Sequence, residues 1–171
     1  YPRDGMPKYI RPMNDMRPMF SWSLDSVRGA LGAGLVHLAV RQEDEKEWGV
    51  SEIVRRYEPG ANILVLPGET QGPADTVQRM IRQFCLRGSF MVKDSDCYWK
   101  ATDPWDPQVN AVAVGWRETA VGDRGTKSWV VLRKDEAGVD LVTWIEEKRT
   151  PTDWYCCGGY QFEDPSDFAE K

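Results

Sequence analysis

The sequence predicts an α/β protein with a mostly parallel central sheet and a β-rich second half. Two observations carry this prediction. From residue 20 to residue 92, segments with apolar side chains at helical spacing alternate with short, continuously apolar runs, an order typical of parallel α/β sheets. After Pro104 the helical spacing stops, and strand-like runs separated by turns follow. The length of 171 residues fits one domain.

Three segments of the first half have the spacing of helices. Residues 20–31 carry Phe20, Leu24, Val27 and Leu31 along one helical face. Residues 45–57 place apolar side chains in a charged background and end before Pro59-Gly60. Residues 73–84 begin with a proline, which the first helical turn tolerates. The proline-rich residues 1–18 have no sustained period and predict an extended entry or loop.

The strands are predicted from runs of apolar residues. Residues 35–40, 63–66 and 89–92 do not alternate between polar and apolar side chains, as expected of strands buried on both faces. The later strands are expected at residues 109–116, 127–133 and 139–145, with a turn at 135–138 between the last two. We see no internal repeat and no linker that would divide the chain.

Charge and composition exclude several classes of function. The formal net charge of −5 argues against non-specific DNA or RNA binding, and no apolar run reaches the length of a membrane span. A single histidine, His37, leaves no basis for a histidine-rich metal site or a Ser-His-Asp triad. The four cysteines lack CxxC spacing, so we expect reduced thiols in a cytoplasmic protein.

Candidate ligands lie where the third strand ends. Asp94 and Asp96 flank one residue there, and ligands of open α/β sheets bind at the carboxyl ends of strands. Two carboxylates are suitable ligands for Mg²⁺ or Mn²⁺, although an Asp-rich solvated turn has the same composition. The loop 66–74, with Gly68 and Gly72, follows the second strand, and its glycines would let a backbone approach a ligand.

The order of five segments resembles that of sugar-phosphate nucleotidyltransferases over about residues 1–168. The segments are PKYI…RPMFSWSLDSV, ETQGPADTV, FMVKDSDCYW, WIEEK and CCGGYQF. The resemblance implies a three-layer, Rossmann-like nucleotidyltransferase fold. It also implies transfer of a nucleotidyl group from an NTP to a sugar or polyol phosphate, which gives an NDP-sugar and pyrophosphate with the help of Mg²⁺ or Mn²⁺.

The resemblance also implies roles for individual residues. Lys8 would contact the transferred phosphate, and Gln71 and Gly72 would recognise the nucleobase. Asp96 matches the metal-binding aspartate better than its neighbour Asp94. The sugar-phosphate side would be formed by three further residues, Glu147, Lys148 and Gly159. Taken without the resemblance, a lone lysine or a Glu-Lys pair is more typical of a solvated surface than of a site.

Two elements of the family pattern fall outside this sequence. The family's Gly-x-Gly-x-Arg element precedes the Pro-Lys segment, and a second metal aspartate follows the Gly-Tyr-Phe strand. We therefore expect residues 1–171 to form one nucleotidyltransferase-like domain that is incomplete at both ends. It would bind an NTP and a sugar phosphate, but neither nucleic acid nor a membrane. A homo-oligomer and a part of a larger polypeptide both stay open.

Two alternatives share this fold class. A metal-dependent GT-A-type glycosyltransferase would use Asp94-x-Asp96 as its sugar-nucleotide metal motif, and it would bind an NDP-sugar without forming pyrophosphate. A non-catalytic nucleotide- or sugar-binding module would bind its ligand without turnover.

Attack of a phosphate oxygen on an α-phosphorus needs no side-chain nucleophile, only positioning and charge neutralisation. An acidic chain with one histidine can therefore support nucleotidyl transfer.

Overall fold

The structure of the protein is a computed structural model. It describes residues 5–31, 34–100, 106–119, 127–147 and 152–169. The helices are α1 (Met19–Leu31), α2 (Gln42–Trp48), α3 (Val50–Tyr57), α4 (Pro73–Phe84) and α5 (Pro165–Ala169), with 3-10 turns η1 (Lys8–Ile10) and η2 (Arg117–Thr119). The strands are β1 (His37–Arg41), β2 (Asn62–Leu66), β3 (Phe90–Lys93), β4 (Ala111–Trp116), β5 (Ser128–Lys134), β6 (Asp140–Glu147) and β7 (Trp154–Phe162).

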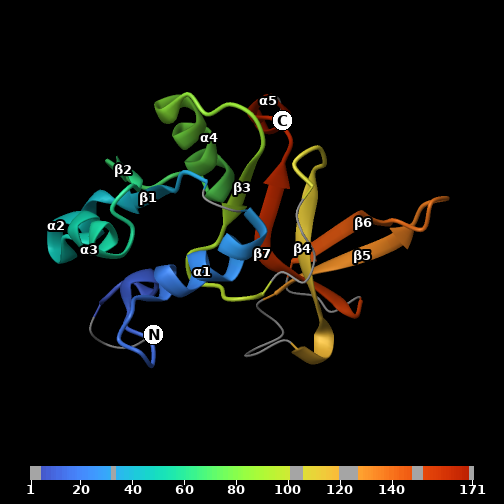
Figure 1. Cartoon of the computed structure of the whole chain (residues 1–171), viewed down its shortest axis with the longest axis horizontal. Helices are drawn as coiled ribbons and strands as arrows, with labels where there is room; N and C mark the ends of the chain where they lie inside the picture. Colours follow the sequence, from blue (N-terminus) through green and yellow to red (C-terminus); the bar gives the residue numbers. More distant parts are fainter. Residues whose placement is uncertain (1–4, 32–33, 101–105, 120–126, 148–151, 170–171) are drawn as a thin grey trace.

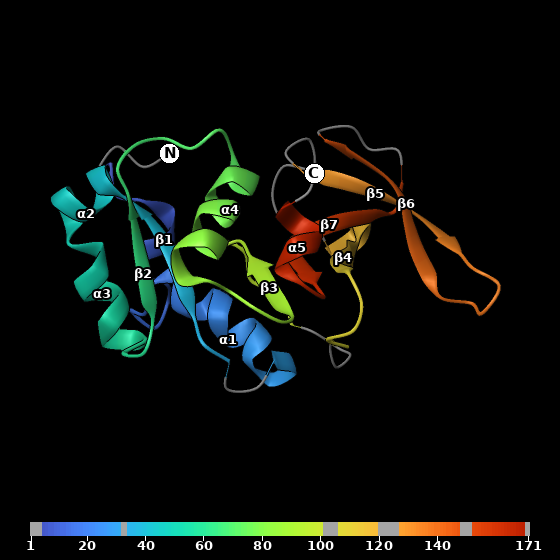
Figure 2. The ribbon, with the colours of Figure 1, turned by 90° about the horizontal axis from the view of Figure 1, so that it is seen from above.

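The strands form two sheets on different sides of the molecule (Figure 1). β1 and β2 make a parallel pair that lies with α2 and α3. The second sheet has the order β3-β7-β5-β6, with β4 also on β7, and all its ladders are antiparallel. The view from above shows α1, and β3 at the edge of the second sheet, between the β1–β2 pair and the rest of that sheet (Figure 2). The chain is thus a mixed α/β protein.

The predicted mostly parallel central sheet is not confirmed. Among the described residues, β1–β2 is the only parallel ladder, because β3 pairs with β7 in an antiparallel sheet. β1 and β3 instead both line a cavity of about 160 Å³, together with α1. The apolar runs correctly predicted the strands. A short apolar run does not, however, indicate with which strand it pairs or whether that pairing is parallel or antiparallel.

One predicted helix is two. The segment 45–57 contains the end of α2 and all of α3, which meet at Gly49. Gly49 has φ 59° and ψ 45°, a left-handed conformation that ends α2, and its N–H donates to the Glu45 carbonyl at 2.9 Å. Glycine adopts this conformation without the steric cost that a Cβ adds. The other predicted helices and the strands around residues 35–40, 63–66, 89–92, 109–116, 127–133 and 139–145 are confirmed, with small shifts at their ends.

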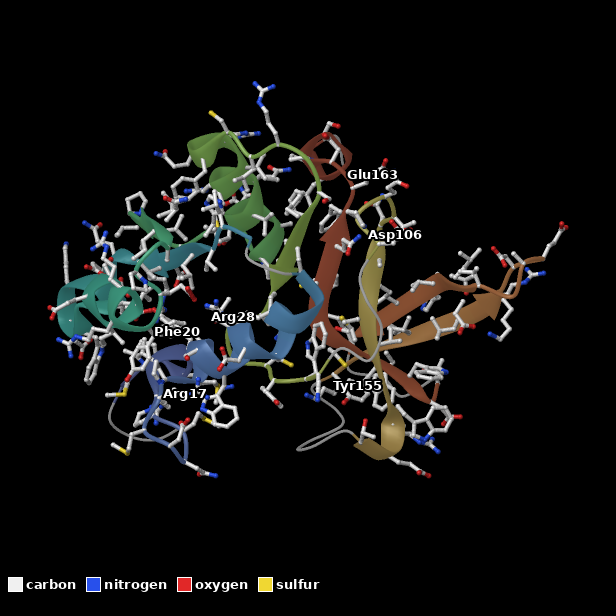
Figure 3. The ribbon with its side chains drawn as sticks, viewed as in Figure 1. Arg17, Phe20, Arg28, Asp106, Tyr155 and Glu163 are labelled. Atoms are coloured by element: carbon white, nitrogen blue, oxygen red, sulfur yellow. The ribbon has the colours of Figure 1, made fainter. Side chains whose placement is uncertain are left out.

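The buried side chains gather at two centres. In the helical part, Ile10, Phe20, Val40, Val50 and Val54 form one apolar cluster. Phe20, labelled in Figure 3, comes from α1 and meets the ring of Tyr57 edge-on. In the β-rich part, the fully buried pair Trp129 and Val130 lies on β5 against β7. Each part therefore has its own core, and α1 of the first part and β3 of the second line a common cavity.

Two further observations concern the described part of the chain as a whole. None of its helices combines the length and the apolar character that crossing a membrane would require. Its four cysteines are free thiols.

Candidate functional site

The turn after β3, residues 94–97, is the centre of the candidate site. β3 pairs with β7, so that Lys93 lies opposite Gly159 and Phe90 opposite Phe162. The turn that follows is tied to β7 at its first residue, because the Asp94 N–H donates to the Gly158 carbonyl at 2.8 Å. The two candidate carboxylates therefore belong to a turn whose first residue is tied to β7.

Lys8 reaches this turn from the other end of the chain. Its Nζ lies 3.7 Å from Asp96 Oδ2, with about half of each side chain exposed. Lys8 begins the 3-10 turn η1, which is anchored on both sides. Tyr9 donates its hydroxyl to Asp44 at 2.7 Å, and Ile10 is buried in the helical core. The structure thus brings together two residues to which the resemblance gave roles, a lysine and a carboxylate.

Asp94 lies against the backbone of β7. Gly158 has φ +70°, and a Cβ at this position would collide with the Asp94 carboxylate. Gly159 is equally constrained, because a Cβ there would meet the Trp99 ring and, at 3.1 Å, Ala113. The register between β4 and β7 shifts at the same place, which marks an irregularity in the ladder. The two glycines therefore make the room in which Asp94 and Trp99 sit.

Negative charges crowd this turn. Asp94 keeps an exposed side, but the burial of its carboxylate on β7, followed by repulsion from Asp96, raises the pKa of Asp94 above its usual value. Burial lowers the pKa of the neighbouring Lys93, although nearby acidic groups oppose this shift. Lys8 and Lys93 offset part of this negative charge, and a bound cation would offset more of it.

The donor set at the turn fits a hard divalent ion that shares its ligands with a substrate. Asp94 and Asp96 offer carboxylate oxygens, the ligand type that Mg²⁺ and Mn²⁺ prefer. Within the described residues, no group of three or more His, Cys, Asp or Glu side chains gathers in a way that could hold a metal. Mg²⁺ commonly takes one or two carboxylates and completes its shell with water and phosphate oxygens, so two carboxylates are sufficient for such a site.

Gln71 and Gly72 lie in a different loop, between β2 and α4. The Gln71 N–H donates to the Asp75 carboxylate at 3.0 Å, and the Thr70 and Thr76 hydroxyls are 2.8 Å apart. These contacts stay inside the loop and the first turn of α4. The Gln71 side chain is exposed at the start of a twelve-residue helix. The structure thus presents Gln71 outward but gives no contact that joins this loop to Asp94 or Asp96.

The predicted sugar-phosphate residues are only partly brought together. Gly159 lies at the site, opposite Lys93. Glu147 ends β6, where it pairs with Ser128. Burial raises the pKa of Tyr160, the next residue after Gly159, and a hydrogen bond with the Cys156 thiol adds to this shift. Lys148 lies outside the described residues.

Three residues of the site were not selected from the sequence. The buried Ser23 of α1 donates to the Asp94 carbonyl at 2.7 Å, an arrangement that no local pattern reveals. The sequence offers a feature that could have selected Gly158, because it stands next to Gly159 in a predicted strand. Lys93 could likewise have been selected, because it directly precedes the segment with the two aspartates. Both signals are ambiguous without the fold, because glycine pairs and lysines at strand ends are common.

Comparisons with known proteins agree on the fold. No family model matches the chain, and no curated protein gives a significant match. Among solved structures, a nucleoside-diphosphate-sugar pyrophosphorylase from Vibrio cholerae RC9 has a TM-score of 0.73 at 22% identity, covering 97% of this chain and 68% of that one. A UDP-glucose pyrophosphorylase complexed with UDP-glucose has a TM-score of 0.64 at 16% identity, covering 96% and 70%.

A third neighbour extends the range of substrates within the same fold. The inositol-1-phosphate CTP transferase from T. maritima has a TM-score of 0.69 at 12% identity, covering 99% of this chain and 66% of that one. The chain thus spans about two thirds of the length of these proteins. At such identities the likeness establishes the fold, which is that of the sugar-phosphate nucleotidyltransferases.

Proposed function

We propose that this chain is a nucleotidyltransferase domain that transfers a nucleotidyl group from an NTP to a sugar or polyol phosphate. The observation that carries the proposal is the placement of Lys8 Nζ 3.7 Å from Asp96 Oδ2, at a strand end, with Asp94 beside them. A lysine can offset phosphate charge directly, and two carboxylates can do so through a divalent cation that they hold. The fold shared with nucleotide-sugar pyrophosphorylases supports this choice.

The reaction requires positioning more than side-chain chemistry. A phosphate oxygen of the acceptor attacks the α-phosphorus of the NTP, the bond from that phosphorus to the bridging oxygen breaks, and pyrophosphate leaves with the bonding electrons. Lys8 offsets charge on the transferred phosphate as it develops. Asp94 and Asp96 would hold Mg²⁺ or Mn²⁺, which supplies further positive charge to the phosphate oxygens. No histidine or nucleophilic side chain takes part.

Recognition of the nucleobase and of the acceptor sugar phosphate is assigned to the other residues that the resemblance selected. In the proposal, Gln71 offers an exposed amide and Gly72 an accessible backbone to the nucleobase. Gly159 would let the Trp99 ring pack directly on β7 beside the acceptor sugar, because a side chain at position 159 would collide with that ring. Glu147 and Lys148 complete the acceptor side, where a carboxylate accepts sugar hydroxyls and a lysine contacts the phosphate.

A binding and turnover panel tests the proposal. The chain is heated with each NTP and with several NDP-sugars, with and without Mg²⁺, and pyrophosphate release is then followed with a set of sugar phosphates. A ligand at 100 times its dissociation constant adds about 2.7 kcal/mol to the free energy of unfolding. For a domain of this size that corresponds to a rise in the midpoint of roughly 5–10 °C.

The outcomes separate the functional classes. A Mg²⁺-dependent shift with one NTP, followed by pyrophosphate release, supports nucleotidyl transfer. Binding of an NDP-sugar without pyrophosphate release in any mixture supports a glycosyltransferase, and NTP binding without turnover supports a non-catalytic module. A flat panel contradicts all three.

A further inference from the structure

Lys93 is a cation inside the candidate site, and it does not face solvent as Lys8 does. It is the last residue of β3, half-buried, and its ladder partner is Gly159. Its Nζ lies 5.3 Å from the centre of the Trp99 ring. Trp99 in turn packs on Gly159. The ammonium group therefore sits between the end of β3, the turn and β7.

The Lys93 ammonium donates to the backbone of the turn and not to its carboxylates. It donates to the Asp94 carbonyl at 3.0 Å and to the Cys97 carbonyl. These two carbonyls flank the segment that contains Ser95 and Asp96, so one ammonium group joins both ends of the turn. The segment Asp94-Ser95-Asp96 contains neither proline nor glycine, the residues that most often define a turn. The hydrogen bonds from Lys93 hold the two ends of this turn together instead.

Two more tethers act on the same backbone from other elements. The Ser23 hydroxyl of α1 donates to the Asp94 carbonyl at 2.7 Å. The Cys97 thiol donates to the Cys157 carbonyl of β7 at 2.9 Å. Lys93 is the only one of these donors that contacts both ends of the turn within the described contacts. Its loss would free the segment that carries Asp96 while leaving α1 and β7 attached to the flanks.

We infer that Lys93 is a positioning residue that closes the turn 94–97 and thereby sets the orientation of Asp94 and Asp96 toward a divalent cation. The inference rests on the proposed function. Groups that orient metal ligands without touching the metal typically change the affinity by 10–100-fold when they are removed. Lys93 contacts backbone carbonyls, and a divalent ion bound to the carboxylates would not need to displace it.

A purely electrostatic role predicts the opposite effect. If Lys93 only offset the charges of Asp94 and Asp96, its removal would leave two less-compensated carboxylates, and a cation would bind more tightly. If Lys93 positions the turn, its removal weakens binding, because the carboxylates lose their common orientation. The sign of the change in affinity therefore distinguishes the two roles.

The test is a Mn²⁺ titration of the whole chain, followed by electron paramagnetic resonance of the free ion. We expect Lys93→Met to weaken Mn²⁺ binding by about 10–100-fold, and Lys93→Arg, which keeps a charged donor, to recover most of the affinity. The matched control is Lys134→Met. Lys134 also donates to a turn carbonyl, that of Gly138 at 3.2 Å, but it does so in the β5–β6 turn. The control variant should bind Mn²⁺ like the wild type.

Several results would overturn the inference. Equal or tighter Mn²⁺ binding by Lys93→Met, with an unchanged circular dichroism spectrum, contradicts the positioning role and leaves the proposed function standing. An absence of Mn²⁺ binding in the wild type, both without and with an added NTP, contradicts the metal site of the proposed function itself. If Lys93→Met does not fold, Lys93→Gln replaces it, because a glutamine stays polar but cannot reach both carbonyls, and the same loss of affinity is expected.

Discussion

The pair formed by Lys8 and Asp96 is held by geometry more than by its own attraction. About half of each side chain is exposed, and ion pairs of this kind add only about 0–1 kcal/mol to stability. What fixes the pair is the anchoring of η1 through Tyr9 and Ile10 on one side and the tethered turn on the other. The two residues are therefore free to exchange their mutual contact for a phosphate.

Removal of either member of the pair should separate activity from stability. We expect Lys8→Ala and Asp96→Ala each to lower the rate of pyrophosphate release by at least ~10²-fold, the scale of losing one electrostatic stabiliser. The melting midpoint should hardly change, because both side chains are half-exposed. Lys46→Ala, at an exposed position in α2, is the control. A folded Asp96→Ala protein with a near-normal rate would disprove its role.

At the scale of elements, strand β7 organises the β-rich part of the molecule. It pairs with β3, β4 and β5, and its irregular middle brings Gly158 against Asp94. The same strand therefore supports the sheet and shapes the site. A change in its middle should affect the site and the sheet together, whereas a change in the β5–β6 turn should affect only local stability.

A glycine comparison tests the role of β7. Gly158→Ala introduces a Cβ at φ +70° that collides with the Asp94 carboxylate, whereas Gly138→Ala introduces one at φ +82° with nothing within 4 Å. Both variants should lose about 1–2 kcal/mol from the left-handed backbone. Gly158→Ala should lose more, and it alone should bind Mn²⁺ more weakly. Urea unfolding and a Mn²⁺ titration measure the two effects, and equal losses in both variants would contradict the close contact.

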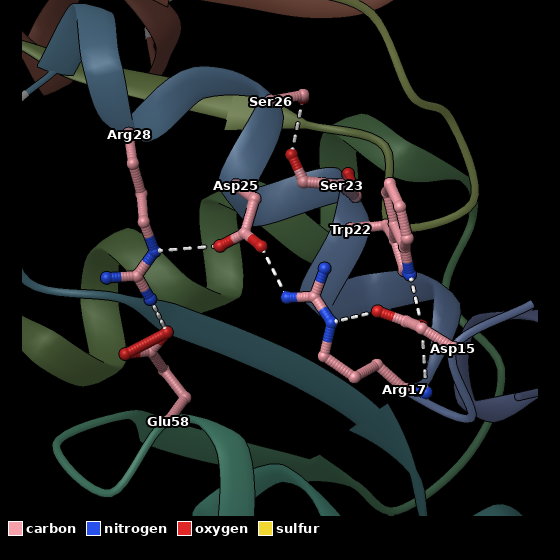
Figure 4. Close-up of polar contacts among 8 residues, drawn as sticks. All are labelled: Asp15, Arg17, Trp22, Ser23, Asp25, Ser26, Arg28 and Glu58. Atoms are coloured by element: carbon pink, nitrogen blue, oxygen red, sulfur yellow. Dashed lines mark hydrogen bonds and ion pairs between the residues drawn. The ribbon is translucent and has the colours of Figure 1, made fainter. Parts of the chain in front are cut away.

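At the scale of the whole molecule, a network of charged side chains joins three segments of the helical part. Arg17 donates to Asp15 at 2.6 Å and to Asp25 at 2.5 Å, and Arg28 pairs with Asp25 and with Glu58 (Figure 4). These residues belong to the segment before α1, to α1 itself and to the end of α3. The network therefore links α1, which also carries the Ser23 tether to the site, to the segment before it and to Glu58.

The network predicts a pH-dependent stability. The hydrogen bond from Arg17, aided by one from Trp22, lowers the pKa of Asp15 to about 2 from 3.8. A carboxylate with a lowered pKa stabilises the folded state fully above its unfolded value, and this contribution disappears as the pH falls through about 2. Asp15→Asn should therefore be less stable than the wild type at pH 5–7, and the difference should shrink between about pH 4 and pH 2.

Urea unfolding at a series of pH values measures this difference. Glu47→Gln removes a charge of the same sign from an exposed position in α2 and should show no comparable trend. A difference between Asp15→Asn and the wild type that stays constant from pH 7 to pH 2.5 would show that the Asp15 carboxylate gains nothing from Arg17 in the folded state.

Local patterns predicted most of the elements. Helical spacing located α1 and α4, and apolar runs located the strands, because these periods record which side chains face the core. The single helix expected at residues 45–57 was wrong, since the left-handed conformation of Gly49 divides it. The order of short motifs also selected Lys8, Asp94 and Asp96, the residues that meet at the turn.

The sequence by itself determined the alternation of helices and strands, the α/β class and the chemical types present at the strand end. Only the tertiary structure decided that β3 joins β7 in an antiparallel sheet, that Lys8 reaches Asp96, and that Ser23, Lys93 and Gly158 hold the turn. The physical reason is the range of the interactions. Periodicity and turn chemistry act between near neighbours, whereas strand pairing and buried tethers join residues that only the packed chain brings together.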